Sequence, residues 1–149
     1  MKTRLSVTQT GADTFTAEQL ILPQLDGKSG YLFKYIRAMW LQSTSVTPAD
    51  SWLKAMLQTV ATPQTFDSDD VIDAVGWGIT TMAAAQATMF ADLFKEHELN
   101  EPRLSVQPDI YVGIKSSATT QINSVIVEVG FEIVKLSELE FLRLLAGGA

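Results

Sequence analysis

The stretch of sequence that decides the fold lies near the end of the chain, at residues 125–134, and reads VIVEVGFEIV. Large apolar side chains occupy every second position, and successive side chains of a strand point to opposite faces of its sheet. One face would therefore carry Val125, Val127, Val129, Phe131 and Ile133. The other face is half polar, with Glu128 and Glu132 on either side of Gly130. We predict a long strand here, with one face in the core.

The pattern changes to helical spacing directly after this strand. Ser137 and Glu140 have the spacing of a capping box, in which each side chain satisfies a backbone N–H group at the start of a helix. Apolar residues then follow at helical spacing, namely Leu139, Phe141, Leu142, Leu144 and Leu145. Gly147 and Gly148 supply a helix stop. A long strand followed by a short apolar helix indicates a part of the chain that serves burial and assembly.

The rest of the chain carries further strand patterns separated by turn residues. They lie around Leu5 and Val7 and at Phe15–Leu22, Tyr31–Leu41, Val71–Thr81 and Ile110–Ile114. The segment Tyr31–Leu41 is apolar and aromatic on both faces, which is typical of a central strand covered on both sides. In Val71–Thr81, Gly76 and Gly78 alternate with larger residues. They leave one face flat, where another backbone or a bulky side chain can approach.

One internal segment predicts a helix instead. Thr47 and Pro48 suit the cap and the first position of a helix. Helical spacing follows at Trp52, Leu53, Met56, Leu57 and Val60, so we predict a helix over residues 48–60. Residues 82–99 fit either a helix or a strand, and we expect a loop followed by a strand. Pro102 and Pro108 predict an exposed segment between them.

Together these patterns give about eight antiparallel strands, with turns at fairly regular spacing and short helices that include the C-terminal one. Such a pattern favours an all-β chain, folded as a jelly-roll β-sandwich, over an α/β fold. A chain of 149 residues is long enough for one domain with its own core. We therefore predict a single domain over residues 1–149.

The composition limits the classes of function. Charged residues make up only 19% of the chain, against about a quarter in typical soluble domains, and hydrophobic residues make up 46%. This predicts a surface covered by neutral side chains or by partner molecules. The net charge of −6 disfavours strong nucleic-acid binding, and the first ten residues hold only Lys2 and Arg4 as cations. The N-terminus lacks the apolar core of a signal peptide, so we expect synthesis and use without signal-peptide export.

Candidate metal-binding and acid–base residues are few. His97 is the single histidine and the chain has no cysteine, so a zinc site would need carboxylates for every other ligand. We expect His97 to be a solvated surface residue. Four aspartates crowd one turn without the spacing of an EF-hand loop: Asp67, Asp69, Asp70 and Asp73. We expect them in turn or helix-cap roles, and whether Asp67, Asp69 and Asp70 bind a lattice ion stays open.

The other candidate sites also favour a structural interpretation. Glu128 and Glu132 would lie about 13 Å apart at roughly 3.3 Å per residue, too far for the carboxylate pair of a glycoside hydrolase. We interpret them as an exposed or interfacial strand face. Trp40, Trp52 and Trp77 are predicted as core or interface anchors. We therefore predict no enzyme activity, no catalytic residue, no metal and no cofactor.

The order of these elements resembles that of the single jelly-roll coat proteins of small tailless icosahedral viruses. Four segments carry the resemblance and together span most of the chain: Phe15–Trp40, Val71–Thr81, Pro108–Ile114 and Val125–Val134. The resemblance implies two facing four-stranded sheets and the assembly of many copies into a closed shell, the capsid, without catalysis. It also implies a location in the virion, after synthesis in the host cytoplasm.

The same resemblance implies which residues meet a neighbouring copy. The C-terminal helix would clasp another subunit through Leu139, Phe141, Leu142 and Leu145, with Trp77 as a further interface residue. Many coat proteins of this type carry a basic N-terminal arm that binds the genome, and Lys2 and Arg4 do not make such an arm. Copies of the chain itself are the expected partners, and other capsid proteins or an internal membrane stay open as further ones.

Two alternatives to a capsid subunit stay open at this point. One is a non-enzymatic β-sandwich module that binds a glycan or a peptide, on a phage appendage or a cellular protein, in a groove lined by Trp77 or Tyr111. The other is an enzyme on a cupin-like jelly roll, which is weaker because such sites use several histidines and this chain has one. A capsid subunit is expected to form large oligomers, and the binding module only small ones.

Overall fold

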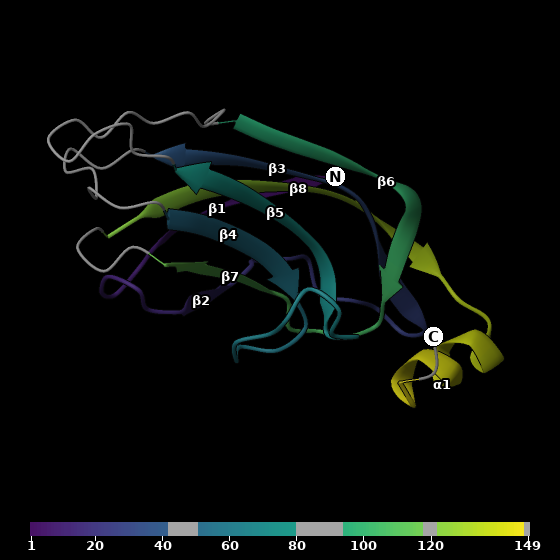
Figure 1. Cartoon of the computed structure of the whole chain (residues 1–149). Helices are drawn as coiled ribbons and strands as arrows, with labels where there is room; N and C mark the ends of the chain where they lie inside the picture. The colour runs from purple at the N-terminus through teal and green to yellow at the C-terminus, as the bar shows by residue number, and fades with distance from the viewer. Residues whose placement is uncertain (42–50, 80–93, 118–121, 148–149) are drawn as a thin grey trace, which may run out of the picture.

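The computed structural model describes residues 1–41, 51–79, 94–117 and 122–147. These residues form eight strands and one helix (Figure 1). In chain order they are β1 (Lys2–Thr8), β2 (Thr16–Gln19), β3 (Ser29–Leu41), β4 (Ser51–Gln58), β5 (Val71–Ile79), β6 (Phe94–Ser105), β7 (Tyr111–Ser116), β8 (Ser124–Lys135) and α1 (Glu138–Leu145). The strands form two four-stranded sheets, in which each strand pair is antiparallel.

The strand order is that of a jelly roll. One sheet has the order β1-β8-β3-β6 and the other has the order β2-β7-β4-β5. The first half of the chain therefore pairs with the second half in reverse, β1 with β8, β2 with β7, β3 with β6 and β4 with β5, as in one long hairpin. Rolling up this hairpin adds the pairs β3–β8 and β4–β7, which complete the two sheets. The predicted all-β jelly-roll sandwich with a C-terminal helix is confirmed.

The core lies between the two sheets and is built from alternate side chains of each strand. On β8 the buried set is Val125, Val127, Val129 and Phe131, with Ile133 packed against it, as the pattern at residues 125–134 predicts. The facing sheet contributes Leu53, Ala55, Leu57, Val112 and Ile114 to the same cluster. Each large side chain buried in this way contributes roughly 1.5–3 kcal/mol, so the sandwich is stabilised chiefly by these two inner faces.

Strand β3 differs from the prediction in how it buries its side chains. The register shifts between Phe33 and Tyr35, so the strand contains a β-bulge there. The core residues are Tyr31 and Phe33 before the bulge and Ile36, Ala38 and Trp40 after it. Met39 and Leu41 lie on the opposite face and are exposed. The expectation of a strand covered on both faces is therefore wrong, because the bulge moves the core-facing set from odd to even positions.

The helix predicted over residues 48–60 is wrong for the part of it that the structure describes. Residues 51–58 form β4, which lies between β5 and β7 and pairs with both. Met56 and Gln58 are buried, as are Leu53, Ala55 and Leu57 on the opposite face. Around Met56 the strand is buried on both faces, and the resulting apolar run of Ala55, Met56 and Leu57 imitates helical spacing. Pairing with two neighbouring strands outweighs the local helix preference, and residues 48–50 lie outside the described residues.

Strand β6 begins near the end of the segment, residues 82–99, that the sequence left uncertain. Residues 94–99 are strand, as expected, whereas residues 82–93 lie outside the described residues. Pro102 and Pro108 are exposed, as expected, but Pro102 lies within β6 and Val106 between them is buried. Proline is tolerated there because β6 is an edge strand and its pairing with β3 is interrupted between Glu98 and Arg103.

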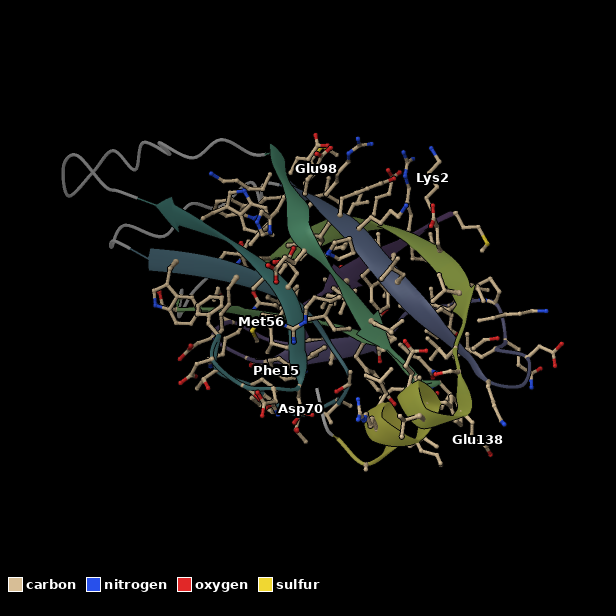
Figure 2. The ribbon with its side chains drawn as sticks, turned by 90° about the vertical axis from the view of Figure 1, so that its right-hand side faces the viewer. Lys2, Phe15, Met56, Asp70, Glu98 and Glu138 are labelled. Atoms are coloured by element: carbon tan, nitrogen blue, oxygen red, sulfur yellow. The ribbon has the colours of Figure 1, made fainter. Side chains whose placement is uncertain are left out.

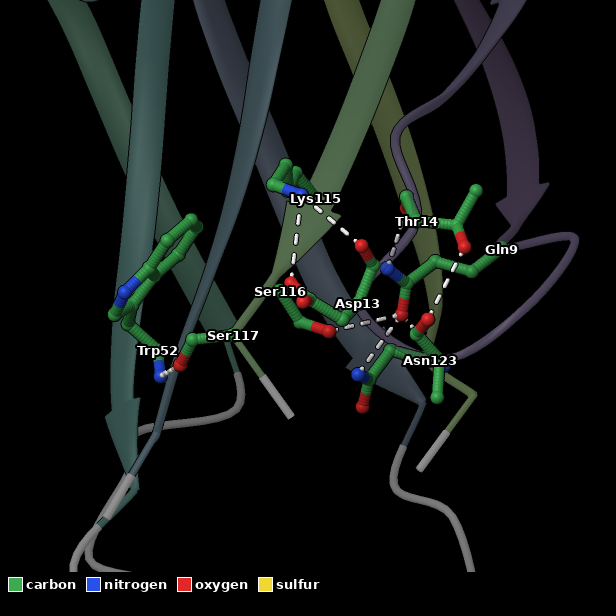
Figure 3. Close-up of polar contacts among 9 residues, drawn as sticks. Gln9, Asp13, Thr14, Trp52, Lys115, Ser116, Ser117 and Asn123 are labelled. Carbon is green, nitrogen blue, oxygen red and sulfur yellow. Dashed lines mark hydrogen bonds and ion pairs between the residues drawn. The ribbon is translucent and has the colours of Figure 1, made fainter. Parts of the chain in front are cut away.

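A buried polar cluster ties the sheets together at one end of the sandwich (Figure 3). Gln9, just after β1, accepts hydrogen bonds at its Oε1 atom from the backbone N–H of Asn123 at 3.0 Å and from the Ser116 hydroxyl of the facing sheet at 3.2 Å. The Trp40 indole donates to Asn123 Oδ1 at 3.1 Å. Such buried polar groups stabilise a fold only when they are hydrogen-bonded, so this cluster fixes the strand ends around it.

Candidate assembly interface

The C-terminal helix α1 forms through the local signals that the sequence predicts. The Ser137 hydroxyl accepts a hydrogen bond from the backbone N–H of Glu140 at 3.3 Å, and the backbone N–H of Ser137 donates to the Glu140 carboxylate at 2.9 Å. This is the predicted capping box, and the hydrogen bonds to the Glu140 carboxylate hold its pKa below the usual value. Gly147 adopts a φ of 73° just after the helix, a conformation that glycine tolerates best.

The apolar side of α1 is exposed. Leu139, Leu142 and Leu145 are 60%, 55% and 52% exposed, and no residue of α1 is buried. Residues three positions apart lie on one side of a helix, so these three leucines form a continuous stripe, which we call the leucine stripe. Figure 1 shows α1 beyond the ends of the strands, and Figure 2 shows it at the margin of the sandwich. Because each leucine is already partly covered, a partner that buries it gains about half of the roughly 1.5–3 kcal/mol for full burial.

Two contacts hold α1 at this place. The backbone N–H of Leu136 donates to the carbonyl oxygen of Lys28 at 2.8 Å, and the Lys28 ammonium lies 3.2 Å from the Glu138 carboxylate. A helix of eight residues is not stable in water by its own hydrogen bonds, so it depends on such contacts and on its caps. Within the described residues no helix is long and apolar enough to cross a membrane.

The predicted interface residues divide into three groups. Leu139, Leu142 and Leu145 are exposed, as an interface requires, and Phe141 is half-buried. Trp77 is only 4% exposed and packs against Trp40, with 6.3 Å between the ring centroids. The side chain of Trp77 therefore belongs to the core, and its assignment to an interface is corrected.

A second apolar feature lies on the outer face of β4 and β5. Trp52 and Phe66, which are 43% and 61% exposed, stand beside Lys54, Gly76 and Gly78 around a groove of about 480 Å³. The Lys54 ammonium lies 5.5 Å from the Trp52 ring centroid and 5.0 Å from that of Phe66, within range of both rings for a cation–π interaction. We call these five residues the aromatic groove.

The two glycines form the floor of the aromatic groove. Among the described residues, no atom lies within 4 Å of the position that a Cβ atom would take at Gly78, and at Gly76 the nearest is a backbone oxygen at 3.5 Å. The flat face that the alternating glycines predict is therefore present and open. Trp77 is also among the residues that line this groove, as expected for a binding module, whereas Tyr111 is not. The predicted helix over residues 48–60 put Trp52 on a helix face, whereas it lies on the outer face of β4.

The aspartates of the β4–β5 connection lie next to Phe66. The Thr65 hydroxyl donates to Asp67 at 2.6 Å, and this hydrogen bond holds the pKa of Asp67 below its usual value. The Thr59 hydroxyl donates to Asp70 at 3.2 Å. Within the described residues, no group of three or more His, Cys, Asp or Glu side chains is arranged to hold a metal ion. The carboxylates of Asp67 and Asp70 thus stabilise the loop through hydrogen bonds.

The outer face of the other sheet carries a network around Glu128. Glu128 accepts a hydrogen bond from Arg4 Nε at 2.6 Å and longer ones, at 3.4 Å, from Arg37 and from the Tyr35 hydroxyl. The hydrogen bond from Arg4 is the main reason why the pKa of Glu128 is held below its usual value. Glu128 is only 6% exposed, so this part of the face is covered by its own neighbours.

His97 is half-exposed, as expected, but it has a partner. Its Nδ1 atom lies 2.8 Å from the Asp73 carboxylate. His97 lies on β6 and Asp73 on β5, which are edge strands of the two different sheets. This contact therefore bridges the sheets along one open side of the sandwich.

The leucine stripe of α1 and the aromatic groove of β4 and β5 are thus among the open apolar features of the described surface. The first extends from the end of β8 in one sheet, and the second lies on the other sheet. No family model matches this chain, and no curated protein matches its sequence.

Proposed function

We propose that this protein is a structural subunit of a closed protein shell, a virion capsid, which it builds from copies of itself without catalysing a reaction. The observation that carries the proposal is the exposed leucine stripe, held by a capped helix at the margin of a jelly roll whose core is already complete. The sandwich does not bury this stripe, so its three leucines are available to a partner.

A rigid sandwich suits a shell subunit for a physical reason. A shell is built from the same contacts repeated many times, so each subunit must present its contact surfaces at fixed positions. The rolled-up strand order ties both ends of the chain into one sheet, where β1 and β8 are neighbours. The helix α1 follows β8 after two residues and is therefore attached to a strand that pairs with neighbours on both sides.

The charges at the start of the chain bear on the contents of the shell. Arg4 lies in β1 and pairs with Glu128, so its charge is offset within the sheet. With a net charge of −6, we propose that the subunit does not bind nucleic acid strongly. Copies of itself are the main partners in this proposal, with other capsid proteins or an internal membrane as the candidates for lining the inside. The location that goes with it is the virion, after synthesis in the host cytoplasm.

The proposal is tested by the size of the purified protein. Light scattering and negative-stain microscopy are expected to show closed particles, or rings that grow into particles as the protein concentration rises. A stable monomer or dimer at all concentrations would contradict the proposal.

The aromatic groove favours a second candidate, a non-enzymatic module that binds a glycan or a peptide. Exposed aromatic rings beside a flat glycine floor offer stacking area for such a ligand. This candidate predicts a small oligomer that retains a ligand from a glycan or peptide array, and that loses the ligand when Trp52 is replaced by alanine.

A further inference from the structure

We propose that the leucine stripe of α1 docks into the aromatic groove of a second copy of this chain. The inference rests on the proposed function, since it names the two surfaces by which subunits would join. Both surfaces are apolar and open in the described part of a single chain, and each offers what the other lacks: a protruding row of leucines and a groove with aromatic walls.

The helix in the groove comes from another copy, because local contacts hold α1 away from the groove of its own chain. Only Leu136 and Ser137 separate the end of β8 from the start of α1. The hydrogen bond from Leu136 and the ion pair of Glu138 both go to Lys28, so the first turn of α1 is fixed beside the start of β3. Strands β3 and β8 belong to one sheet and the groove to the other. In the described chain, none of the residues around the groove belongs to α1.

The dimensions of the two surfaces match. From Leu139 to Leu145 the stripe is about 9 Å long, at 1.5 Å per residue of helix. Trp52 and Phe66 both lie within 5.5 Å of the Lys54 ammonium, so the two rings are close enough for one stripe of this length to touch both. Because Gly76 and Gly78 have no side chains, a helix can approach β5 closely beside the two rings.

The charges of α1 and of the groove are complementary when the docked helix lies in one of its two possible orientations. The first turn of α1 carries Glu138 and Glu140, and its last turn carries Arg143. The groove has Lys54 between its rings and an acidic connection, with Asp67 and Asp69, next to Phe66. A helix with Arg143 towards the acidic connection places its acidic first turn on the side of Lys54. Complementary charges of this kind fix the orientation of a partner more than its affinity.

The proposed contact joins two different surfaces, so it is heterologous. Each copy gives one helix and receives one helix, and such a contact forms a ring when the rotation between copies closes and an open filament when it does not. A closed shell needs contacts of this type in addition to any symmetric ones. The inference thus explains why a chain with a complete core keeps an apolar helix outside it.

The test uses the absence of cysteine from the chain. Leu142→Cys and Gly78→Cys are made as separate variants, mixed and oxidised, so that a mixed disulfide forms only between copies. Gly78 is open to solvent and accepts a side chain without a clash. The matched control mixes Leu142→Cys with Met39→Cys, since Met39 is also exposed but lies on the other sheet. The expected result is a mixed disulfide with Gly78→Cys and at least tenfold less with Met39→Cys.

The same samples are examined by negative-stain microscopy, which separates the inference from the proposed function. Particles that form without preferential coupling of residues 142 and 78 would overturn the inference alone. Protein that remains monomeric would overturn the proposed function and the inference with it. Binding of a soluble glycan at Trp52, read from its fluorescence, with no coupling of the two cysteines would also overturn the inference.

Two substitutions test the contact without new covalent bonds. Trp52→Ala is expected to raise the protein concentration needed for half-maximal assembly about tenfold or more, because a large buried ring is lost from the interface. Met39→Ala is the control and should leave that concentration unchanged. Arg143→Asp should weaken assembly, and mixing it with Asp69→Arg should restore contacts between the two variants. Equal effects of Trp52→Ala and Met39→Ala would contradict the inference.

Discussion

The ring of Tyr35 on β3 lies directly over Gly130 on β8, its partner in the strand register. A Cβ atom at position 130 would overlap the ring, so only glycine fits beneath it. From this place the Tyr35 hydroxyl reaches Glu128 at 3.4 Å, and the Arg37 guanidinium lies 4.6 Å from the centre of the ring. One glycine in the strand that decides the fold thus positions an aromatic ring, a carboxylate and an arginine on the outer face of the sheet.

Gly130→Ala is expected to destabilise the fold because the new methyl group displaces the Tyr35 ring. We expect a loss of about 1–3 kcal/mol in the free energy of unfolding, measured by denaturant titration. Gly78→Ala is the matched control, since a Cβ atom at Gly78 meets no other atom within 4 Å. Equal unfolding midpoints for the two variants would show that the Tyr35 ring does not need the glycine.

Glu128→Gln is expected to lower stability at neutral pH and to change its acid dependence. The hydrogen bond from Arg4 lowers the pKa of Glu128 in the folded state, so its stabilising effect is present above the ordinary pKa of a glutamate and is lost as the pH falls through the folded pKa. We expect a loss of about 1.5–3 kcal/mol at pH 7. Denaturant titrations from neutral to acidic pH should show a smaller decline for the variant than for the wild type.

Glu132→Gln serves as the comparison for that pH series. The Lys34 ammonium donates to Glu132 and lowers its pKa, but both side chains are about half-exposed. Solvent screens such a pair, so its loss should matter less than that of Glu128. The same change in stability for the two variants at every pH would contradict the account of the Glu128 network.

Trp77→Ala and Phe131→Ala are expected to act through cavities in the core. Both side chains are almost fully buried between the sheets, and removing them should cost about 3–5 kcal/mol each, measured by thermal or denaturant unfolding. Trp52→Ala is the control for Trp77→Ala, because Trp52 is partly exposed on the outer face. A melting temperature of Trp77→Ala that equals the wild-type value would show that Trp77 is not a core residue.

Deletion of Ser137–Ala149 is expected to impair assembly far more than folding. No residue of α1 is buried, so the sandwich keeps its core without the helix, and the melting temperature should change by no more than about 4 °C. Circular dichroism reports the fold and size-exclusion chromatography the assembly. Particles of unchanged size and yield after the deletion would contradict the role of α1.

The sequence correctly predicts the elements in which each face has a single environment, either core or solvent. Strand β8 has a single core face, so its alternation is clean, and α1 carries its capping signals within four residues. Strand β4 is buried on both faces around Met56, and β3 changes its core face at a bulge. Both features depend on neighbouring strands that pair from far along the chain, and a local pattern does not contain that information.

The two surfaces of the candidate interface also differ in whether the sequence alone predicts them. The leucine stripe is local to one helix, so the sequence alone indicates it. The aromatic groove joins Trp52 on β4, Phe66 in a connection and two glycines on β5, and it exists only after β4 and β5 pair. The contact between His97 and Asp73 likewise needs the two edge strands to lie on the same side of the sandwich.

The measurement that tests the central claim most directly is the mass of the purified 149-residue chain by light scattering, with negative-stain microscopy of the largest fraction. The account predicts closed particles, or rings that grow into particles with rising concentration, and it predicts that mixing Leu142→Cys with Gly78→Cys links their subunits. A monomer or dimer that stays the same size at every concentration would contradict it.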